Sequence, residues 1–374
     1  MNAALIICAN APYPPTSGTP LRTWQTISLV ARTHCVGVLS IGAREAGSTD
    51  IPGVAQWRHI DVNAPERTAS GFPLLTAAGP IALLEAALRE MVSSLRPRVI
   101  IFSNIWMETR ALPQAHAPRI ILDLHNAYSA YALATGADAG AAAAFESSAA
   151  RCVDAIWTCS EEDARALRPH CAPTEVVVVP NGIDVPWYAE IRKPSRGSRR
   201  GALTLLFVAS YWYEPNRIAA EMLITGILPA VRAAFPRVRL LLVGAAPSDA
   251  MLGAAKIDRQ ISLTGRVHDV RPYLELADIV AAPLTAGSGT RLKLLEALAA
   301  RRAVVTTTKG AEGLALRDGS ELLIRDDVPA FAQALIDLGE DAERRVALAE
   351  QGYRRTCELY GWDALAPAFA EALG

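Results

Sequence analysis

The segment Pro283–Ala300 carries the residues with the clearest chemical potential in this chain. Four small residues lead directly into a helical pattern: Gly287, Ser288, Gly289 and Thr290. The first turn of a helix leaves backbone N–H groups unpaired, and the helix dipole favours negative charge there. Glycine lets the backbone approach a bulky anion, and a hydroxyl can cap the helix or donate to phosphate oxygens. The segment is therefore a candidate cradle for a diphosphate.

Two charged residues follow on one face of this helix. Lys293 and Glu296 are three positions apart, whereas Leu292 and Leu295 face the core. Lys293 would add positive charge near a diphosphate. Glu296 could accept hydrogen bonds from both hydroxyls of a ribose, because a carboxylate has two acceptor oxygens. The same residues also fit an ordinary Lys–Glu helix pair, so both interpretations stay open here.

Two further loops follow predicted strands in the first half of the chain. Asp123 and His125 close an apolar run at residues 120–124. A histidine at the carboxyl end of a buried parallel strand points to the ligand-binding edge of the sheet, although a capped loop histidine would look the same. The loop after the first strand is rich in proline and glycine and includes Gly18 and Thr19. By itself that composition marks any loop.

The elements that must position these residues alternate along the whole chain. In the first half, strands are expected at residues 4–9, 36–41, 99–102, 120–124, 155–158 and 176–179. In the second half, they are expected at residues 203–209, 239–243, 261–263, 279–282, 303–307 and 322–324. Most are apolar on both faces, which is typical of parallel strands covered by helices. The pattern predicts an α/β protein with two doubly wound, Rossmann-like domains.

The domain boundary is expected in the stretch Pro186–Gly201, which has prolines, glycines, a basic cluster and no apolar periodicity. This gives an N-terminal domain at 1–185 and a C-terminal domain at 186–359. The helical segment at about 360–374 is expected to join the first domain. Ligands bind beyond the carboxyl ends of parallel strands, so two such sheets would hold a ligand in the cleft between them.

Composition argues against several classes of protein. The net charge of −1 over 374 residues gives no reason to expect nucleic-acid binding. The six cysteines are scattered without a C-x-x-C pair, which favours reduced thiols in a cytoplasmic protein over zinc. We expect no secretory signal and no membrane span. The apolar stretch at residues 72–88, which runs into an expected helix at 81–95, leaves peripheral membrane contact as the alternative.

Four motifs resemble those of the family 4 retaining glycosyltransferases, which have the GT-B fold. The donor motif is G-S-G-T-R-L-K-L-L-E-A-L-A from Gly287. V-P-N-G-I-D at 179–184 resembles the family's hinge, and Ser210 through Asn216 resembles the first phosphate loop. Residues 264–278 resemble the base-binding loop and the helix after it. Order and spacing agree over nearly the whole second half.

The resemblance implies a role for each matching residue. Glu296 would hold the ribose, and Arg266 and Val267 would read the base. His125 would contact the donor sugar or position the acceptor hydroxyl, oriented by Asp123. The other donor-binding positions are Gly18, Thr19, Ser210, Asn216, Gly287, Ser288, Gly289, Thr290, Arg291, Leu292 and Lys293.

The chain departs from the family pattern at two places. Ser288 stands where the family has a glutamate that touches the donor sugar. The basic pair that many members carry in the first phosphate loop is absent from residues 210–216. Arg291 and Lys293 would supply the missing charge, and Tyr211 and Trp212 could line the sugar site or pack the loop.

The resemblance implies retaining transfer of a sugar from a nucleoside-diphosphate sugar, with UDP favoured, to a hydroxyl-bearing acceptor. That acceptor would be a glycan, a lipid-linked sugar or a small natural product. No cofactor and no metal are expected, since the chain has no D-x-D motif. The alternatives are a GT-B sugar-nucleotide epimerase and a non-catalytic nucleotide-sugar-binding module. A nicotinamide oxidoreductase is disfavoured because no G-x-G-x-x-G follows the first strand.

Overall fold

The computed structural model describes residues 2–9, 11–13, 15, 18–42, 51–61, 81–104, 118–192, 202–287 and 291–374. The chain divides into two compact units. Unit 1 comprises Met1–Asn181 and Leu365–Gly374, and unit 2 comprises Gly182–Ala364. The sequence places the boundary after residue 185. The last helix, α15 (Trp362–Leu373), begins in unit 2 and contributes its later turns to unit 1.

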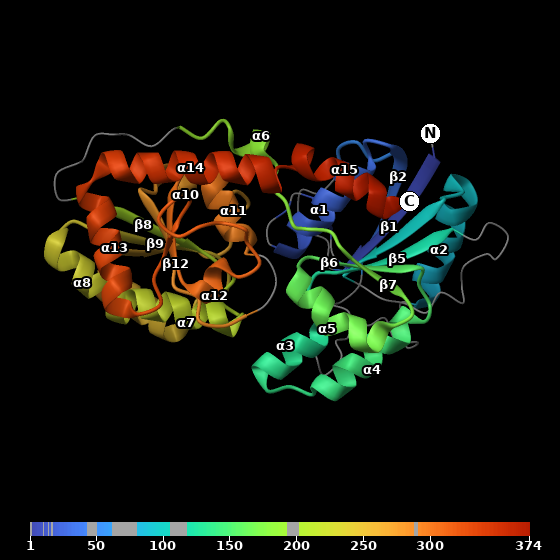
Figure 1. Cartoon of the computed structure of the whole chain (residues 1–374), viewed down its shortest axis with the longest axis horizontal. Coiled ribbons are helices and arrows are strands. Elements are labelled where there is room, and N and C mark those ends of the chain that lie inside the picture. Colours follow the sequence, from blue (N-terminus) through green and yellow to red (C-terminus); the bar gives the residue numbers. More distant parts are fainter. Residues whose placement is uncertain are drawn as a thin grey trace. The chain divides into compact units, whose positions relative to one another are not determined.

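Unit 1 is built on a seven-stranded sheet in which every neighbouring pair is parallel, in the order β3-β2-β1-β4-β5-β6-β7. The strands are β1 (Asn2–Ala9), β2 (His34–Gly42), β3 (Gln56–Asp61), β4 (Val99–Ser103), β5 (Arg119–Leu124), β6 (Ala155–Thr158) and β7 (Glu175–Val178). The helices are α1 (Gly18–Val30), α2 (Ile81–Leu95), α3 (Tyr128–Thr135), α4 (Ala139–Ala150) and α5 (Glu161–Cys171). One hydrophobic core joins α2 through α5 to one face of the sheet, and α1 lies on the other face (Figure 1).

The predicted strands of unit 1 lie within one or two residues of those observed, and β3 was missed. Its sequence, Gln56-Trp-Arg-His-Ile-Asp61, has no apolar run, because β3 is an edge strand with mostly half-buried side chains. Central strands such as β1 are buried on both faces and therefore gave a strong apolar signal.

Unit 2 holds a six-stranded parallel sheet in the order β10-β9-β8-β11-β12-β13. The strands are β8 (Thr204–Val208), β9 (Arg239–Val243), β10 (Ile261–Leu263), β11 (Ile279–Ala282), β12 (Ala303–Thr306) and β13 (Leu323–Ile324). The helices are α6 (Val185–Tyr188), α7 (Glu214–Met222), a π-helix (Leu223–Ile227), α8 (Leu228–Ala234), α9 (Asp249–Ile257), α10 (Arg271–Leu276), α11 (Leu292–Ala299), α12 (Thr308–Ala311), α13 (Val328–Glu340) and α14 (Ala342–Tyr360). Helices α7 and α8 lie on one side of the sheet, and α11 and α14 lie on the other (Figure 1).

The strand order reverses once in each sheet, between β1 and β4 in unit 1 and between β8 and β11 in unit 2. Loops on either side of such a reversal diverge, so the carboxyl ends of these strands form a natural crevice for a ligand. The doubly wound architecture that the sequence predicts is confirmed in both sheets.

Helix α1 buries an unusual face. A helix that packs on a sheet normally buries an apolar stripe, yet α1 buries Arg22, Thr23, Gln25 and Thr26. Buried polar side chains need hydrogen-bond partners. Arg22, Thr23 and Thr26 find theirs at the carboxyl ends of β4 and β5, and Gln25 donates to the carbonyl oxygen of Pro180. The polar face of α1 therefore belongs to a candidate site.

Candidate functional site

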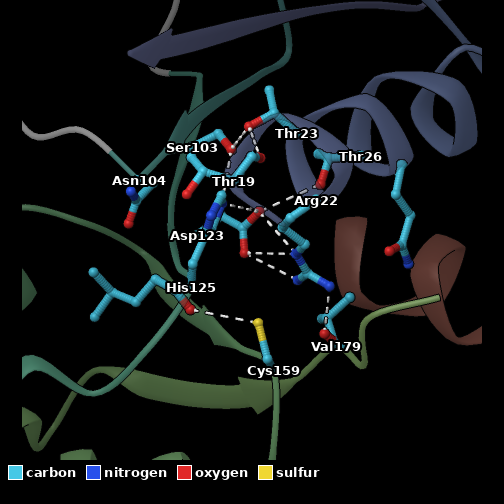
Figure 2. Close-up of polar contacts among 12 residues, drawn as sticks. Thr19, Arg22, Thr23, Thr26, Ser103, Asn104, Asp123, His125, Cys159 and Val179 are labelled. Carbon is cyan, nitrogen blue, oxygen red and sulfur yellow. Dashed lines mark hydrogen bonds and ion pairs between the residues drawn. The ribbon is translucent and has the colours of Figure 1, made fainter. Parts of the chain in front are cut away.

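The centre of the polar cluster in unit 1 is a buried ion pair between Arg22 of α1 and Asp123 at the end of β5 (Figure 2). The guanidinium Nη2 lies 2.9 Å from Asp123 Oδ1, and Nε lies 3.3 Å from both carboxylate oxygens. Arg22 Nη1 donates to the carbonyl oxygens of Val179 and Pro180, at 2.7 and 3.0 Å. Arg22 thus ties α1 to the end of β5 and to the segment that leaves β7.

His125 lies beside this pair and is 8% exposed. Its Nε2 is 3.1 Å from Ser103 Oγ and 3.8 Å from Asp123 Oδ2. Burial lowers the pKa of His125 to about 4; the nearby Arg22 charge also lowers it, and Asp123 opposes the shift. The imidazole is therefore neutral at pH 7. Its buried Nδ1 has no hydrogen-bond partner among the described residues.

The structure brings Asp123 and His125 together as the sequence predicts, but the direct partner of His125 is Ser103. Asp123 Oδ2 is 3.8 Å from His125 Nε2, which is too far for a hydrogen bond, so Asp123 influences the imidazole through its charge. The Asp123 carboxylate accepts its hydrogen bonds from Arg22 and Thr26. Any orienting effect of Asp123 on His125 is therefore indirect. Of the loop before α1, Gly18 and Thr19 form the first turn of that helix, and the rest lies partly outside the described residues.

In unit 2, the loop after β8 and the start of α11 meet, as the sequence predicts. Lys293 Nζ donates a 2.6 Å hydrogen bond to Asn216 Oδ1, and Asn216 Nδ2 donates to the carbonyl of Ser210 at 2.9 Å. Lys293 also lies 5.0 Å from the ring centre of Phe207 in β8. Its charge therefore stands beside the loop that lacks the basic pair.

Glu296 lies one turn further along α11 and is held by a residue that the sequence did not single out. The hydroxyl of Tyr188, from α6, donates to Glu296 Oε1 at 2.8 Å. Burial raises the pKa of Glu296 to about 7, opposed by the Tyr188 hydrogen bond and by Lys293. Burial also lowers the pKa of Lys293 to about 7, with the charge of Arg291 as a further cause. Both groups are thus poised to change their protonation when a charged ligand binds.

The stretch in which the domain boundary is expected begins with ordered structure. Pro186–Ile191 includes most of α6 and buries Tyr188 and Ile191. The Arg271 guanidinium stacks 3.8 Å from the ring centre of Trp187 and pairs with Asp269 at 2.8 Å. These contacts tie α6 to the predicted base-binding loop. The basic residues 193–200 lie outside the described residues.

Four further predicted donor residues follow β10 and β11 at the carboxyl edge of the unit 2 sheet. Arg291 and Leu292 are buried at the start of α11. Arg266 is exposed and Val267 half-buried in the loop after β10. That loop is fixed to the end of β9 by a 3.1 Å hydrogen bond from Gly244 N to Gly265 O. Ser288, Gly289 and Thr290 were predicted as part of the phosphate cradle and lie outside the described residues.

Gly287, the last described residue before that gap, has a conformation that requires glycine. Its φ is +108°, and a Cβ there would lie 2.9 Å from Tyr213 Oη and 3.1 Å from Arg291 Nη2. Of the aromatic residues considered for a sugar site, Tyr211 is buried and its hydroxyl donates to the carbonyl of Phe207 at 3.2 Å, which is a packing role. Trp212 is exposed.

Sequence reasoning overlooked Arg22, Ser103 and Tyr188. The signal for Arg22 was the run of polar residues on one face of a predicted helix, since a helix on a parallel sheet has little reason to bury them. Tyr188 gave no signal, because its stretch of chain has no apolar period. Within the described ranges, no group of three or more acidic, histidine or cysteine side chains could hold a metal ion.

Both units match known protein families. A model described as "Glycosyl transferase 4-like domain" matches residues 23–182, and one described as "Glycosyl transferases group 1" matches residues 202–341. Among solved structures, sucrose-phosphate synthase from Thermosynechococcus elongatus has a TM-score of 0.72 at 16% identity, covering 99% of this chain and 98% of that one. HepE from Anabaena, in complex with UDP-glucose, has a TM-score of 0.69 at 15% identity, covering 99% of each chain.

The sheet orders and these likenesses define a GT-B fold. The family matches then give the more specific assignment, since they cover both units in order. The chain belongs to the family 4 glycosyltransferases.

Curated relatives are similar over part of their length. The phosphatidyl-myo-inositol mannosyltransferase of Mycobacterium tuberculosis is 33% identical over 215 residues, which cover 54% of this chain and 55% of the relative. The protein of that name from Propionibacterium freudenreichii is 28% identical over 222 residues, covering 58% and 54%. The chain thus spans about half the length of the curated relatives it matches. Among its described helices, none is both long and apolar enough to cross a membrane.

Proposed function

We propose that this protein is a retaining glycosyltransferase that moves a hexose from a nucleoside-diphosphate sugar to a hydroxyl group of an acceptor. The observation that carries the proposal is the arrangement at the start of α11. There Lys293 donates to Asn216 in the first turn of α7, and Glu296 lies one turn further along α11, where Tyr188 of α6 donates to it. These residues occupy the carboxyl edge of the sheet beside its reversal point, where a nucleotide is expected to bind.

The residues fit the chemical demand of the reaction. Breaking the bond between the anomeric carbon and phosphate leaves an oxocarbenium-like sugar and a charged diphosphate. Preorganised N–H groups and cations that stabilise this leaving group account for most of the rate in such reactions. Arg291, Lys293 and the backbone N–H groups in the first turn of α11 are suited to that task. With two cations in place, we propose that the reaction needs no metal ion.

Retention of configuration is proposed from family membership. The departing phosphate would accept the proton of the acceptor hydroxyl on the same face of the sugar, which requires no pair of catalytic carboxylates. His125, neutral and buried, is proposed to bind a hydroxyl of the sugar substrate. We do not propose it as a general acid, because a neutral imidazole at pH 7 lacks the acidic proton of an imidazolium.

The identity of the donor is narrowed by the relatives. The curated relatives are called mannosyltransferases, and HepE was solved with UDP-glucose. Mannose and glucose esters of UDP and GDP are therefore the first donors to test, with UDP favoured. The relatives' names also point to a lipid-linked polyol as one acceptor class beside glycans and small molecules. The epimerase alternative is not favoured, because the matching families are glycosyltransferases.

The test is a donor panel on the full chain. The purified protein is incubated with UDP-glucose, UDP-mannose, GDP-glucose and GDP-mannose, and the released nucleoside diphosphate is measured with and without phosphatidylinositol vesicles or free sugars as acceptors. We expect release from one donor, accelerated by an acceptor. Binding of UDP or GDP in calorimetry, without release of nucleoside diphosphate from any donor, would indicate a non-catalytic binding module instead.

Variants of α11 connect the activity to this site. Glu296→Ala should weaken binding of the active nucleotide by about tenfold, since it removes hydrogen bonds to a charged acceptor. Lys256→Ala is the control, because Lys256 is exposed in the last turn of α9, which leads into the amino end of β10. If Glu296→Ala and Lys293→Ala each bind the nucleotide as tightly as the wild type, the nucleotide binds elsewhere.

A further inference from the structure

A chain of three hydrogen bonds leads from the first turn of α1 to His125 (Figure 2). Thr23 Oγ1 donates to the carbonyl oxygen of Thr19 at 3.1 Å. Thr23 Oγ1 and Ser103 Oγ are 2.9 Å apart, and Ser103 Oγ is 3.1 Å from His125 Nε2. Thr23, Ser103 and His125 are all buried.

The number of available protons fixes which atom donates in each of these three hydrogen bonds. A carbonyl oxygen only accepts, so the single hydroxyl proton of Thr23 is used on Thr19. The contact between Thr23 and Ser103 then requires the Ser103 hydroxyl to donate. Because the Ser103 proton is donated to Thr23, Ser103 Oγ can only accept a hydrogen bond from His125. His125 Nε2 must therefore carry a proton. All three bonds can exist together in this direction only.

The charge around the imidazole supports the same direction. Asp123 Oδ2 lies 3.8 Å from His125 Nε2, so a proton on Nε2 faces a carboxylate, whereas a lone pair there would be repelled. The reverse chain would also place two oxygen lone pairs against each other between Thr23 and Thr19. Since His125 is neutral, a proton on Nε2 leaves Nδ1 as a bare acceptor.

We propose that Ser103 and Thr23 are positioning residues that hold His125 in its Nε2–H tautomer, so that the buried Nδ1 accepts a hydrogen bond from a hydroxyl group of the sugar substrate. The inference rests on the proposed function for the identity of the ligand. The tautomer itself rests on the hydrogen-bond chain alone. Nδ1 is more than nine-tenths buried and lacks a partner among the described residues, which is a costly state unless a ligand satisfies it.

The proposal has a chemical consequence for specificity. An acceptor-only atom binds a hydroxyl or an amine but gains nothing from a fluorine, which can accept but cannot donate. The deoxyfluoro analogue at the contacted position should therefore behave like the deoxy analogue. If Nδ1 carried a proton instead, the fluoro analogue would retain part of the interaction.

The tautomer is tested directly in the free protein by nitrogen-15 NMR of the histidine rings, with the His125 signals assigned from His125→Gln. We expect a protonated Nε2 with an observable proton, and an unprotonated Nδ1. In Ser103→Ala, the Nε2 proton should exchange with solvent and broaden, or both tautomers should appear. A wild-type Nδ1–H signal, or an Nε2 proton unaffected by Ser103→Ala, would overturn the proposal.

Turnover gives the second measurement, with the donor that the wild-type protein uses. Ser103→Ala should lower kcat/KM by about tenfold, and Thr23→Ser should retain activity, because serine keeps the hydroxyl that the chain needs. His125→Gln can still donate to Ser103 but has no atom at Nδ1, so it should lose more activity than Ser103→Ala. Equal activity of His125→Gln and the wild type would also overturn the proposal.

Unit 1 offers a matched control for the serine substitution. Ser40 Oγ pairs with His59 Nδ1 at 2.8 Å on β2 and β3, outside the candidate site. Ser40→Ala should alter the His59 signals and leave the His125 signals and turnover unchanged. If the wild-type chain turns over none of the donors, the proposed function fails, while the NMR result still decides whether the Nε2–H tautomer is held by Ser103.

Discussion

Tyr188 and Glu296, which are 108 residues apart in the sequence, are joined by a 2.8 Å hydrogen bond from the tyrosine hydroxyl to the carboxylate Oε1. Tyr188 comes from α6, and Glu296 from α11 in the same unit. The bond fixes the carboxylate proposed to hold a ribose and favours its ionised form. Lys293 acts in the same direction, while Asp269 opposes it. The positioning of Glu296 therefore depends on a segment outside the donor motif.

Tyr188→Phe should weaken binding of UDP or GDP by about tenfold at pH 7, since a hydrogen bond to a charged group contributes about 1.5–3 kcal/mol. Loss of this bond raises the pKa of Glu296 above its present value of about 7, so more of the carboxyl is protonated at neutral pH. The defect should therefore be largest near pH 6–7 and shrink towards pH 9, where the carboxyl ionises in both proteins. Calorimetry across that range measures it.

Tyr353→Phe is the control for this substitution. Tyr353 lies in α14 of the same unit, and its ring, which stacks on Arg301, is retained in phenylalanine. It should bind nucleotide like the wild type. A Tyr188→Phe defect that is constant from pH 6 to 9 would argue that Tyr188 acts on packing and leaves the ionisation of Glu296 unchanged.

Binding of a nucleoside diphosphate should be coupled to proton uptake by Lys293. Its pKa of about 7 in the free protein is far below the usual value for lysine, chiefly because of burial. A diphosphate beside the amine favours the charged form and raises that pKa. At pH 8, where the free amine is mostly neutral, binding should take up a proton. At pH 6, where it is already charged, uptake by Lys293 should vanish.

The uptake is measured by calorimetry at pH 8 in buffers of different ionisation enthalpy. Lys293→Met should remove the uptake, whereas Glu296→Gln should retain it, since Glu296 is ionised at pH 8 in the free protein. Uptake that persists in Lys293→Met would assign the proton to another group.

The buried ion pair between Arg22 and Asp123 should be strongly coupled in stability. Asp123→Leu leaves the Arg22 guanidinium buried without its carboxylate, and such losses cost about 3–5 kcal/mol in free energy of unfolding. Arg22→Met should cost a similar amount. The double variant should be less unstable than the sum of the two single variants, because neither charge is then left alone.

Urea denaturation of the four proteins, followed by intrinsic fluorescence, measures this coupling. Simple addition of the two single effects in the double variant would mean that the two side chains stabilise the unit independently. Arg22 also donates to the Val179 and Pro180 carbonyls, so Arg22→Met should retain a residual cost in the double variant.

The elements that the sequence predicted well share a strong local signal. Strands such as β9, β10 and β11 match their predicted bounds because each is a short apolar run between turn residues. The edge strand β3 was missed because its residues are polar and half-buried. Gly18 and Thr19 were assigned to the loop after the first strand, yet α1 already starts at Gly18, since a proline- and glycine-rich stretch hides the first turn of a helix.

For the candidate site, the sequence identified several residues but not their contacts. Lys293 and Glu296 were found from their spacing on one helix and the glycines before it, and His125 from its place after a buried strand. What each of them contacts did not follow from these patterns. The sequence suggested Asp123 as the partner of His125, whereas the hydrogen bond is with Ser103.

By itself, the amino-acid sequence determined the two doubly wound sheets, the loops that carry the candidate residues and the family to which the chain belongs. These depend on periodicity and turn chemistry within a few residues of each position. Only the tertiary structure decided the pairs Arg22–Asp123 and Tyr188–Glu296, which span 101 and 108 residues. Such contacts depend on how strands and helices pack across a sheet, and the burial that shifts the pKa values of His125, Lys293 and Glu296 arises only from that packing.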